Sequence, residues 1–251
     1  MQDDARMKIG VVIPTLNEAE RLPLRIAELL AQPDVGHILV VDGGSTDGTP
    51  ERARDLGVTV LMSAPGRGRQ LALGAAEARG DVLLFLHADT VFSSGAAAAI
   101  VECLSRDPNI GGGNFRLRFD GGDAFSAWLD GFYAFIRRFG LYYGDSATFV
   151  RRSVYDRIGG IRPLALMEDY DFVRRLSRAG PTANIQHPVL WTSARRFHGR
   201  KPAAIVWGWV KIHVLYWLGR SPDRLAVLYD STRQRERRAG ATGGSTFKSQ
   251  S

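Results

Sequence analysis

The segment Lys8-Ile9-Gly10-Val11-Val12-Ile13-Pro14-Thr15-Leu16-Asn17-Glu18 decides the fold of this chain. Its first six residues form a short run rich in β-branched side chains, which is typical of a buried strand, and Pro14 follows that run. Asn17 can cap a helix over residues 18–31, where apolar residues recur at helical spacing. A buried strand followed directly by an amphipathic helix is the first half of a βαβ unit.

The same alternation continues as far as residue 89. We expect further strands over residues 37–41, 58–62 and 81–86, and helices over residues 46–56 (capped by Thr46 or Asp47) and 68–79. Strands that alternate with helices of about 12 residues predict an α/β fold, with a mostly parallel sheet covered by helices on both faces.

The second half of the chain is less regular. It predicts strands over residues 111–119 and 148–151, and helices over residues 124–139, 168–178 and 203–219. No linker divides the chain, so we expect one domain over residues 1–230. Residues 231–251 are expected to form a basic, disordered tail.

The composition is ordinary for a globular protein: 45% of the 251 residues are hydrophobic and 24% are charged. A net charge of +7 suits anionic partners, although a solvated basic surface explains it as well. The single cysteine, Cys103, excludes an intramolecular disulfide and fits a reducing cytoplasm. We see no signal peptide, and the most apolar stretch, residues 203–218, is interrupted by Lys211 and His213.

Polar residues and glycines follow the first two predicted strands. The first strand is followed by Pro14, Thr15, Asn17 and Glu18, and the second by Asp42, Gly43 and Ser45. Because parallel sheets bind ligands at the carboxyl ends of their strands, the two loops together favour a nucleoside pocket. Each loop alone is explained by turn and cap chemistry. The glycine fingerprint of NAD or FAD sites is missing after the first strand.

A glycine- and arginine-rich loop, Gly66-Arg67-Gly68-Arg69-Gln70, opens the third predicted helix. Arginine side chains and the free N–H groups of a helix start both suit a diphosphate. A basic loop with an ordinary helix cap is the alternative.

The fourth strand ends at His87-Ala88-Asp89. Side chains two residues apart on an extended segment point the same way, so His87 and Asp89 could share one divalent ion. Waters and substrate phosphates would complete such a site, and an imidazole ligand favours Mn²⁺ over Mg²⁺. The alternative is that His87 packs against the sheet.

Acidic residues open the helix predicted at residue 168, in the sequence Glu168-Asp169-Tyr170-Asp171. A carboxylate in a pocket can accept the proton of a sugar or alcohol hydroxyl. Acids at a helix start also stabilise the helix dipole, which explains the motif without chemistry.

These segments, in this order, resemble the family 2 glycosyltransferases with the GT-A fold, over about residues 8–230. The most specific parts are the pair Ile13-Pro14-Thr15-Leu16-Asn17-Glu18 and Val40-Val41-Asp42-Gly43-Gly44-Ser45-Thr46-Asp47-Gly48-Thr49. Residues 66–71, 84–90, 143–145, 167–169 and 192–196 are most similar to a small bacterial subgroup. That subgroup is labelled arsenosugar-biosynthesis, or radical-SAM-and-selenodomain-associated, glycosyltransferases.

The resemblance implies an inverting, metal-dependent transfer of a sugar from a nucleotide-sugar to a hydroxyl acceptor, with UDP the first choice of carrier and GDP the second. Residues 8–110 would bind the donor and residues 111–230 the acceptor. Asp169, beside Glu168, would be the catalytic base, and the metal (Mn²⁺ or Mg²⁺) would be held by Asp89, with His87 and His198 as further candidates. His87 stands where many relatives have aspartate.

The implied donor site is the larger set. It comprises Pro14, Thr15, Asn17, Glu18, Asp42, Gly43, Ser45, Gly66, Arg67, Arg69, His87, Ala88, Asp89, Arg195 and Arg196.

The expected partners are a small-molecule or lipid acceptor, a second copy of the chain in a homodimer, and no nucleic acid. Tryptophans near basic residues in 203–218 predict a peripheral membrane contact at the inner face of a cytoplasmic membrane, with a core or dimer helix as the alternative.

Two other functions compete with transfer. A nucleotidyltransferase would show a glycine-rich loop with a lysine after the first strand. A non-catalytic sugar-nucleotide or membrane-surface binding protein would not need the acid pair.

Overall fold

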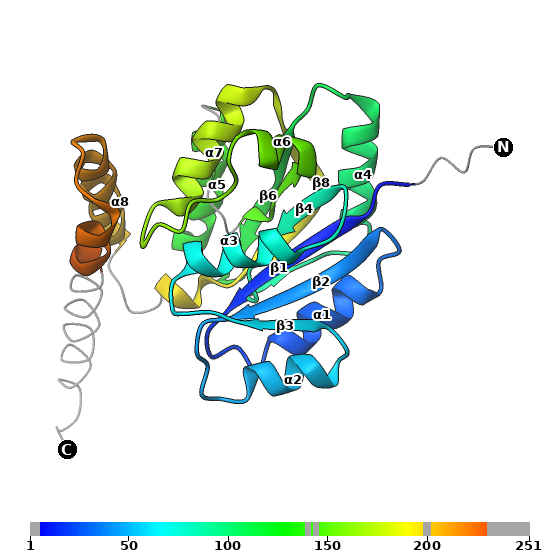
Figure 1. Cartoon of the computed structure of the whole chain (residues 1–251). Helices are drawn as coiled ribbons and strands as arrows, with labels where there is room; N and C mark the ends of the chain where they lie inside the picture. Colours follow the sequence, from blue (N-terminus) through cyan, green and yellow to red (C-terminus); the bar gives the residue numbers. More distant parts are fainter. Residues whose placement is uncertain (1–5, 139–141, 143–145, 198–201, 230–251) are drawn as a thin grey trace, which may run out of the picture.

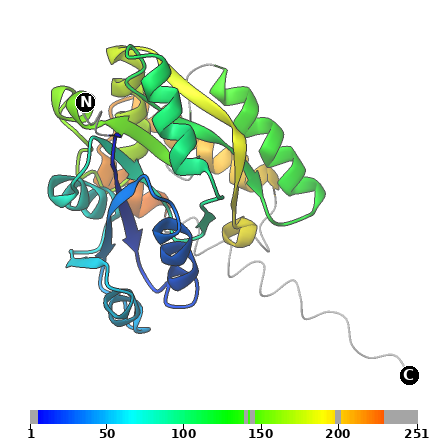
Figure 2. The same ribbon diagram turned by 90° about the vertical axis from the view of Figure 1, so that its right-hand side faces the viewer.

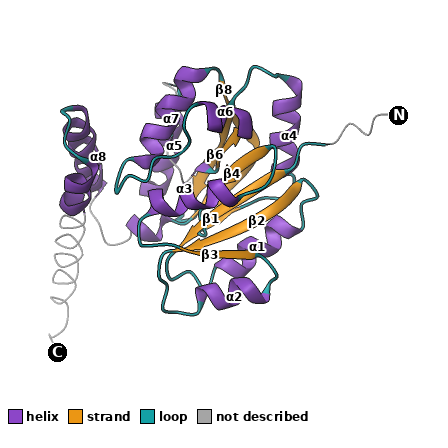
Figure 3. Ribbon diagram, viewed as in Figure 1, coloured by secondary structure: helices purple, strands orange, loops and turns teal. Residues whose placement is uncertain are grey.

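The computed structural model describes residues 6–138, 142, 146–197 and 202–229, which form an eight-stranded mixed sheet with helices on both faces (Figure 1; Figure 3). The strands are β1 (Ile9–Thr15), β2 (Val35–Asp42), β3 (Thr59–Met62), β4 (Val82–Phe85), β5 (Thr90–Val91), β6 (Gly112–Phe119), β7 (Thr148–Arg151) and β8 (Thr182–Thr192). The α-helices are α1 (Leu22–Leu30), α2 (Thr49–Asp55), α3 (Arg67–Glu77), α4 (Ala96–Arg106), α5 (Ala124–Arg137), α6 (Arg152–Arg157), α7 (Glu168–Ala179) and α8 (Pro202–Trp217). The predicted α/β class with C-terminal helices is confirmed.

The sheet order is β3-β2-β1-β4-β7-β6-β8-β5. The first four strands are parallel, with Thr15 opposite Asp42 where β1 and β2 end. β7 runs antiparallel to β4 and places Thr148 opposite Phe85. The carboxyl ends of β1, β2 and β4 and the start of β7 therefore lie at one edge of the sheet.

Two hydrophobic clusters fill the space on either side of the sheet. On one face Val12 and Leu39 pack with Leu71 of α3 and Phe172 of α7. On the other face α1 and α4 cover β1 and β4, and the fully buried Ile26 lies in that cluster. Figure 2 shows the yellow β8 running between α4 and α5. Helices thus cover both faces, as the alternating sequence pattern predicts.

Helix α8 lies away from the sheet in Figure 1 and packs against the start of α7. The indole N–H of Trp217 donates to the Tyr170 hydroxyl over 2.8 Å, and Ile212 packs beside Met167 and Tyr170. Among the described residues, no helix is both long enough and apolar enough to cross a membrane.

Two predicted helix caps are wrong. Helix α1 begins at Leu22, and Asn17 instead adopts a left-handed conformation (φ 56°) and accepts the Thr46 N–H with its side-chain oxygen over 2.9 Å. Helix α2 begins at Thr49 after Gly48, later than a cap at Thr46 or Asp47 predicts. Short polar side chains in these loops tie one loop to the other, which local spacing along the chain does not reveal.

Neither β8 nor α4 is predicted from the sequence pattern. Along β8 only Ile185, Leu190 and Thr192 are buried, so neither the alternation of a half-buried strand nor a continuous apolar run is present. β8 is nevertheless the central partner of the second half of the sheet, because it pairs with both β6 and β5.

Gly74 marks the closest contact between α3 and the sheet. A Cβ atom there would lie 2.8 Å from Cγ2 of Val41 and closer still to Cγ1 of Val12. We expect Gly74→Ala to lower the free energy of unfolding by about 1–3 kcal/mol, because a filled core must shift to admit a methyl group. Urea unfolding followed by circular dichroism measures this.

Gly208→Ala in α8 is the matched control. No atom lies within 4 Å of the added Cβ at this helical position, so this change should leave stability equal or raise it by up to about 1 kcal/mol. Equal stability of the two variants would contradict close packing at Gly74.

Candidate active site

The loops after β1 and β2 are joined through Asp42, which is fully buried. Its Oδ1 accepts the N–H groups of Gly44 (2.9 Å) and Ser45 (2.7 Å). Its Oδ2 accepts the hydroxyls of Thr15 (3.1 Å) and Ser45 (2.5 Å). Asp42 thus fixes the shape of the loop, and its place in the donor site stays a prediction.

Further hydrogen bonds hold the same two loops together. The Asn17 N–H donates to Ser45 Oγ over 2.8 Å, and the Gly43 N–H donates to the Thr15 carbonyl over 3.0 Å. Pro14 is half-buried and Thr15 is buried. The structure therefore brings the predicted nucleoside residues of both loops into one hydrogen-bonded unit.

Arg195 joins two carboxylates that are distant in sequence. Its guanidinium forms an ion pair with Glu18 and lies 4.0 Å from Oδ2 of Asp89. Burial raises the pKa of Glu18, the Arg195 charge opposes that rise, and the nearby Asp89 adds to it. Oε2 of Glu18 is buried and has no hydrogen-bond partner in the part of the chain that the structure describes. Glu18, Asp89 and Arg195 therefore form a cluster of charged side chains at the ends of β1 and β4.

Strand β8 brings Arg195 to this edge. Thr192, its last residue, pairs with Thr90, and the two hydroxyls lie 3.2 Å apart. The chain then enters a short 3₁₀ helix, Ala194–Phe197, directly beside the turn that holds Asp89. Since the sequence pattern predicts no strand here, only the resemblance to the family places Arg195 in the site.

The first turn of α3 attaches to the same edge. The Gln70 side-chain amide donates to the carbonyls of Thr15 and Val41, each over 2.8 Å. Gly68 lies against the 162–164 loop, where a Cβ would be 2.5 Å from the Leu164 carbonyl oxygen. The sequence pattern gives no role to Gln70. In the structure its side chain is buried, and its two hydrogen bonds hold α3 on the sheet.

Arg67 connects α3 to the acid pair that opens α7. It forms ion pairs with Glu168 and, over 3.0 Å, with Oδ2 of Asp169. A phosphate contact for Arg67 stays a prediction, because in this structure its guanidinium binds carboxylates. Arg69, two residues on, is exposed, and Gly66 has a positive φ of 135° at the helix start.

The two acids differ in their access to solvent. The Glu168 side chain is 2% exposed and that of Asp169 is 13% exposed. Burial raises the pKa of Glu168, and the Arg67 charge opposes that rise. Oδ1 of Asp169 accepts the Tyr170 N–H over 2.7 Å. Of the two carboxylates, Asp169 is therefore the one that a small molecule reaches more easily.

The model of the family described as glycosyl transferase family 2 matches residues 10–160, from β1 to the end of the segment after α6. The chain belongs to glycosyl transferase family 2. The matched region contains the loops after β1, β2 and β4, and the acid pair and Arg195 follow it in sequence.

Three similar proteins illustrate the likeness. An uncharacterized glycosyltransferase of Nostoc sp. is 34% identical over 114 residues, covering 42% of this chain and 35% of that protein. The mannosyltransferase PcManGT from Pyrobaculum calidifontis, solved in complex with GDP-Man and Mn²⁺, superposes with a TM-score of 0.61 at 19% identity. That superposition covers 96% of this chain and 77% of the other.

The third is glucosyl-3-phosphoglycerate synthase from Mycobacterium tuberculosis, in complex with Mn²⁺, UDP-glucose and phosphoglyceric acid. It superposes with a TM-score of 0.55 at 22% identity, covering 74% of this chain and 70% of that one. At these identities the two structures show a shared fold. The matched segment spans about a third of the length of the Nostoc relative. The narrower resemblance to the arsenosugar-biosynthesis subgroup stays a prediction.

The residues of this family member fit a metal ion that is shared with a donor rather than held by protein alone. In the described part of the chain, no three His, Cys, Asp or Glu side chains are grouped as a metal site. The orphaned Oε2 of Glu18 and the carboxylate of Asp89 are hard oxygen ligands at one edge. Donor phosphates and water would supply the other ligands.

The other predicted metal and donor residues have different places. His87 is half-buried in the turn before Asp89, and Ala88 is buried in the core. His198 lies outside the described residues, and for Arg196 only the backbone is described.

Proposed function

We propose that this family member transfers a sugar from a nucleotide-sugar donor to the hydroxyl group of an acceptor. One observation carries the proposal: the loops after β1, β2 and β4 and the acid pair of α7 meet at one edge of the sheet. Gln70 and Arg67, one turn of α3, link the strand ends to the acids. The complexes of the two neighbours with GDP-Man and with UDP-glucose support a donor of this kind.

For the donor, we propose UDP as the first choice of carrier and GDP as the second. The loop around Asp42 would bind the nucleoside, and Arg69 and Arg195 would neutralise the diphosphate. A divalent cation, Mn²⁺ or Mg²⁺, held by Asp89 with His87 or Glu18 nearby, would stabilise the negative charge of the leaving diphosphate. Arg195 lies close enough to Asp89 to share that task.

For the reaction, we propose that Asp169 accepts the proton of the acceptor hydroxyl. The hydroxyl oxygen would then attack the anomeric carbon from the face opposite the nucleotide, so that the configuration inverts. Glu168 is buried and forms an ion pair with Arg67. Arg67 forms a second ion pair with Asp169. Glu168 is thus a positioning residue in this proposal, and Asp169 is the catalytic one.

The two alternatives have weaker support. A binding protein has no need for a buried acid held by an arginine, because a buried ion pair is costly to desolvate. A nucleotidyltransferase would carry glycines and a lysine in the loop after β1, where this chain has Pro14, Thr15 and Asn17.

The surface of helix α8 is relevant to whether the acceptor is a lipid. The helix leaves large apolar side chains in solvent, with Trp207 69% and Trp217 61% exposed, and it also carries the exposed Lys211. Tryptophan near basic residues suits a membrane interface. Contact of residues 203–218 with a membrane, a lipid acceptor, a homodimer and a cytoplasmic location all stay predictions.

A donor screen tests the proposed function. We expect UDP or GDP, with Mn²⁺, to raise the melting temperature, and the matching nucleotide-sugar to be hydrolysed slowly to the free nucleotide. Removing the metal with EDTA should abolish the slow hydrolysis and reduce the shift of the melting temperature, since a ligand that binds the folded state more weakly stabilises it less. Binding without hydrolysis for every common donor would favour the binding protein, and no binding at all would reject the proposal.

A further inference from the structure

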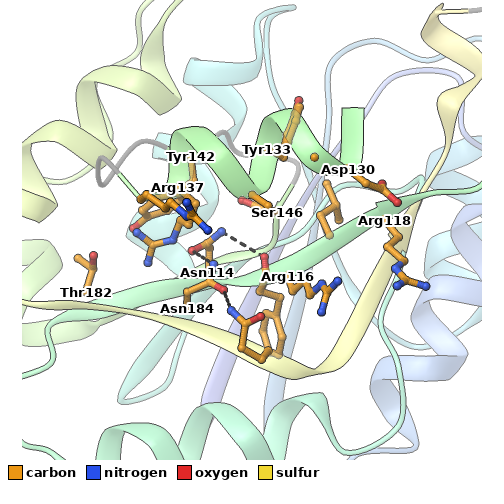
Figure 4. Close-up of a pocket in the computed structure, with 16 residues that line it drawn as sticks. Asn114, Arg116, Arg118, Asp130, Tyr133, Arg137, Tyr142, Ser146, Thr182 and Asn184 are labelled. Atoms are coloured by element: carbon orange, nitrogen blue, oxygen red, sulfur yellow. Dashed lines mark hydrogen bonds between the residues drawn. The ribbon is translucent and has the colours of Figure 1, made fainter. Parts of the chain in front are cut away.

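A cavity of about 610 Å³ lies between α5, β6 and β8. In Figure 4, α5 covers one side, and Asn114 and Asn184 lie on the strands beneath it. No sequence motif pointed to this place. Its size suits a small molecule or the head group of a larger one.

The lining of the cavity carries an excess of positive charge. Four arginines line it, two from β6 and two from the end of α5, and among the lining residues that the structure describes the only carboxylate is Asp130. Burial raises the pKa of Asp130, although the Phe119 N–H and the charges of Arg118 and Arg116 oppose that rise. Guanidinium groups that outnumber carboxylates in a partly desolvated site favour an anionic ligand.

Two buried donors in this cavity have no partner among the described residues. Arg137 donates from Nη2 to the Ala183 carbonyl over 2.7 Å and stacks 4.5 Å from the ring of Tyr142, but its Nε is unsatisfied. The hydroxyl of Tyr142, a residue 3% exposed, is also unsatisfied. Because buried polar groups are almost always hydrogen-bonded, these two atoms point to a ligand that accepts hydrogen bonds.

The polar floor of the cavity is fixed by its own hydrogen bonds (Figure 4). Gln186 donates to Asn184, Asn184 donates to Asn114 over 3.2 Å, and Asn114 donates to the Phe115 carbonyl over 3.1 Å. Since these amides are already oriented, binding a ligand here costs little ordering of the site.

Strand β7 connects the cavity to the edge of the sheet where β1, β2 and β4 end. Ser146 lines the cavity, and two residues later Thr148 pairs with Phe85 at the end of β4. Because the pairing is antiparallel, the chain before Thr148 runs toward the turn that holds Asp89. A molecule bound by the arginines can therefore extend toward the proposed reaction centre.

We propose that this cavity binds the anionic group, a phosphate or a carboxylate, of the acceptor. The role as acceptor site rests on the proposed function, whereas the binding of an anion does not. The test therefore measures donor binding and anion binding separately.

The test follows the arginine Nε–Hε signals by NMR while inorganic phosphate or glycerol 3-phosphate is added, with glycerol as the uncharged comparison. UDP and Mg²⁺ are first added to saturation so that phosphate cannot enter the donor site. If UDP does not bind, the proposed function fails, and the titration is run without nucleotide. We expect both phosphates, and not glycerol, to shift the Arg137 signal.

Arg116→Gln is the decisive variant, because Arg116 is exposed and has no hydrogen bond or ion pair within the described chain. It should weaken phosphate binding about tenfold or more, as expected for a lost charge-assisted hydrogen bond. Arg157→Gln is the matched control, since Arg157 is exposed on α6 at the opposite edge of the sheet and should leave binding unchanged.

A second arm separates a soluble acceptor from a lipid one. Arg116→Gln and Arg157→Gln are compared for binding to phosphatidylglycerol vesicles. If Arg116→Gln weakens the binding of free phosphate but not of vesicles, the cavity binds a soluble anion. If it weakens the binding of both, the cavity binds a lipid phosphate. Phosphate binding that is absent in the wild type, or unchanged in Arg116→Gln, overturns the proposal.

Discussion

Replacing Asp169 with asparagine is expected to slow sugar transfer about 10²–10⁴-fold, which is the usual cost of losing a general base. Asparagine keeps the size of the side chain and the oxygen that accepts the Tyr170 N–H, but it cannot take up a proton. Nucleotide affinity should change little, because the nucleoside loops contact α3 through Gln70 rather than through Asp169. Release of UDP from UDP-glucose, with water as acceptor, measures the rate without a known acceptor.

Asp171→Asn is the matched control for this change. Asp171 lies two residues further along α7, where it pairs with Arg175 over 2.8 Å and with Arg162 over 3.3 Å. The control loses a carboxylate on the same helix but should keep activity close to wild type. If Asp169→Asn stays within about tenfold of wild type, Asp169 is not the base.

Replacing Asp89 with asparagine should remove the metal-dependent part of nucleotide binding. Even residues that only support a metal ligand cost about 10–100-fold in metal affinity when mutated, so losing a direct carboxylate ligand should cost at least that much. Isothermal titration calorimetry with UDP, carried out once in the presence of Mn²⁺ and once in the presence of EDTA, separates the metal-dependent part of the UDP affinity. In EDTA the wild type and the variant should bind UDP alike.

Asp55→Asn serves as the control, because Asp55 is exposed on α2. It removes the same charge from the protein and should leave the Mn²⁺ dependence intact. An unchanged Mn²⁺ dependence in Asp89→Asn would exclude Asp89 as a ligand and would leave Glu18 and His87 as the candidates to examine.

The first half of the fold could be predicted from the sequence because its information is local. β1, β2, β3 and β4 are short runs rich in apolar residues, each followed by a loop with glycine or polar residues, and the structure has all four. Helix α7 begins at Glu168 as predicted and ends at Ala179, one residue later than expected. Its acidic start and the buried Phe172 and Leu176 are signals that a single segment carries.

The second half depends on contacts between distant segments, which local patterns do not reveal. β8 has no regular alternation of buried and exposed residues, and its place is set by pairing with β6 and β5. The position of Arg195 beside Glu18, 177 residues earlier in the chain, follows from that pairing. Without β8, the sequence pattern gives no reason to place Arg195 at the edge.

The candidate active site, too, was only partly predictable from local sequence patterns. Arg67 was predicted at a diphosphate, because an arginine at a helix start suits one. In the structure its guanidinium holds Glu168, 101 residues away, and Asp169. The cavity under α5 is formed by arginines from β6 and α5 that no motif connects. Local chemistry identified the residue types, and the three-dimensional pairing decided their partners.

We propose that donor, metal and base meet at the edge of the sheet formed by the ends of β1, β2 and β4. The most direct measurement is a crystal structure with UDP and Mn²⁺, in which the anomalous signal locates the metal. We predict one manganese within bonding distance of the Asp89 carboxylate and of the diphosphate, with uracil in the loop shaped by Asp42. Manganese or diphosphate bound away from Asp89 would contradict the account.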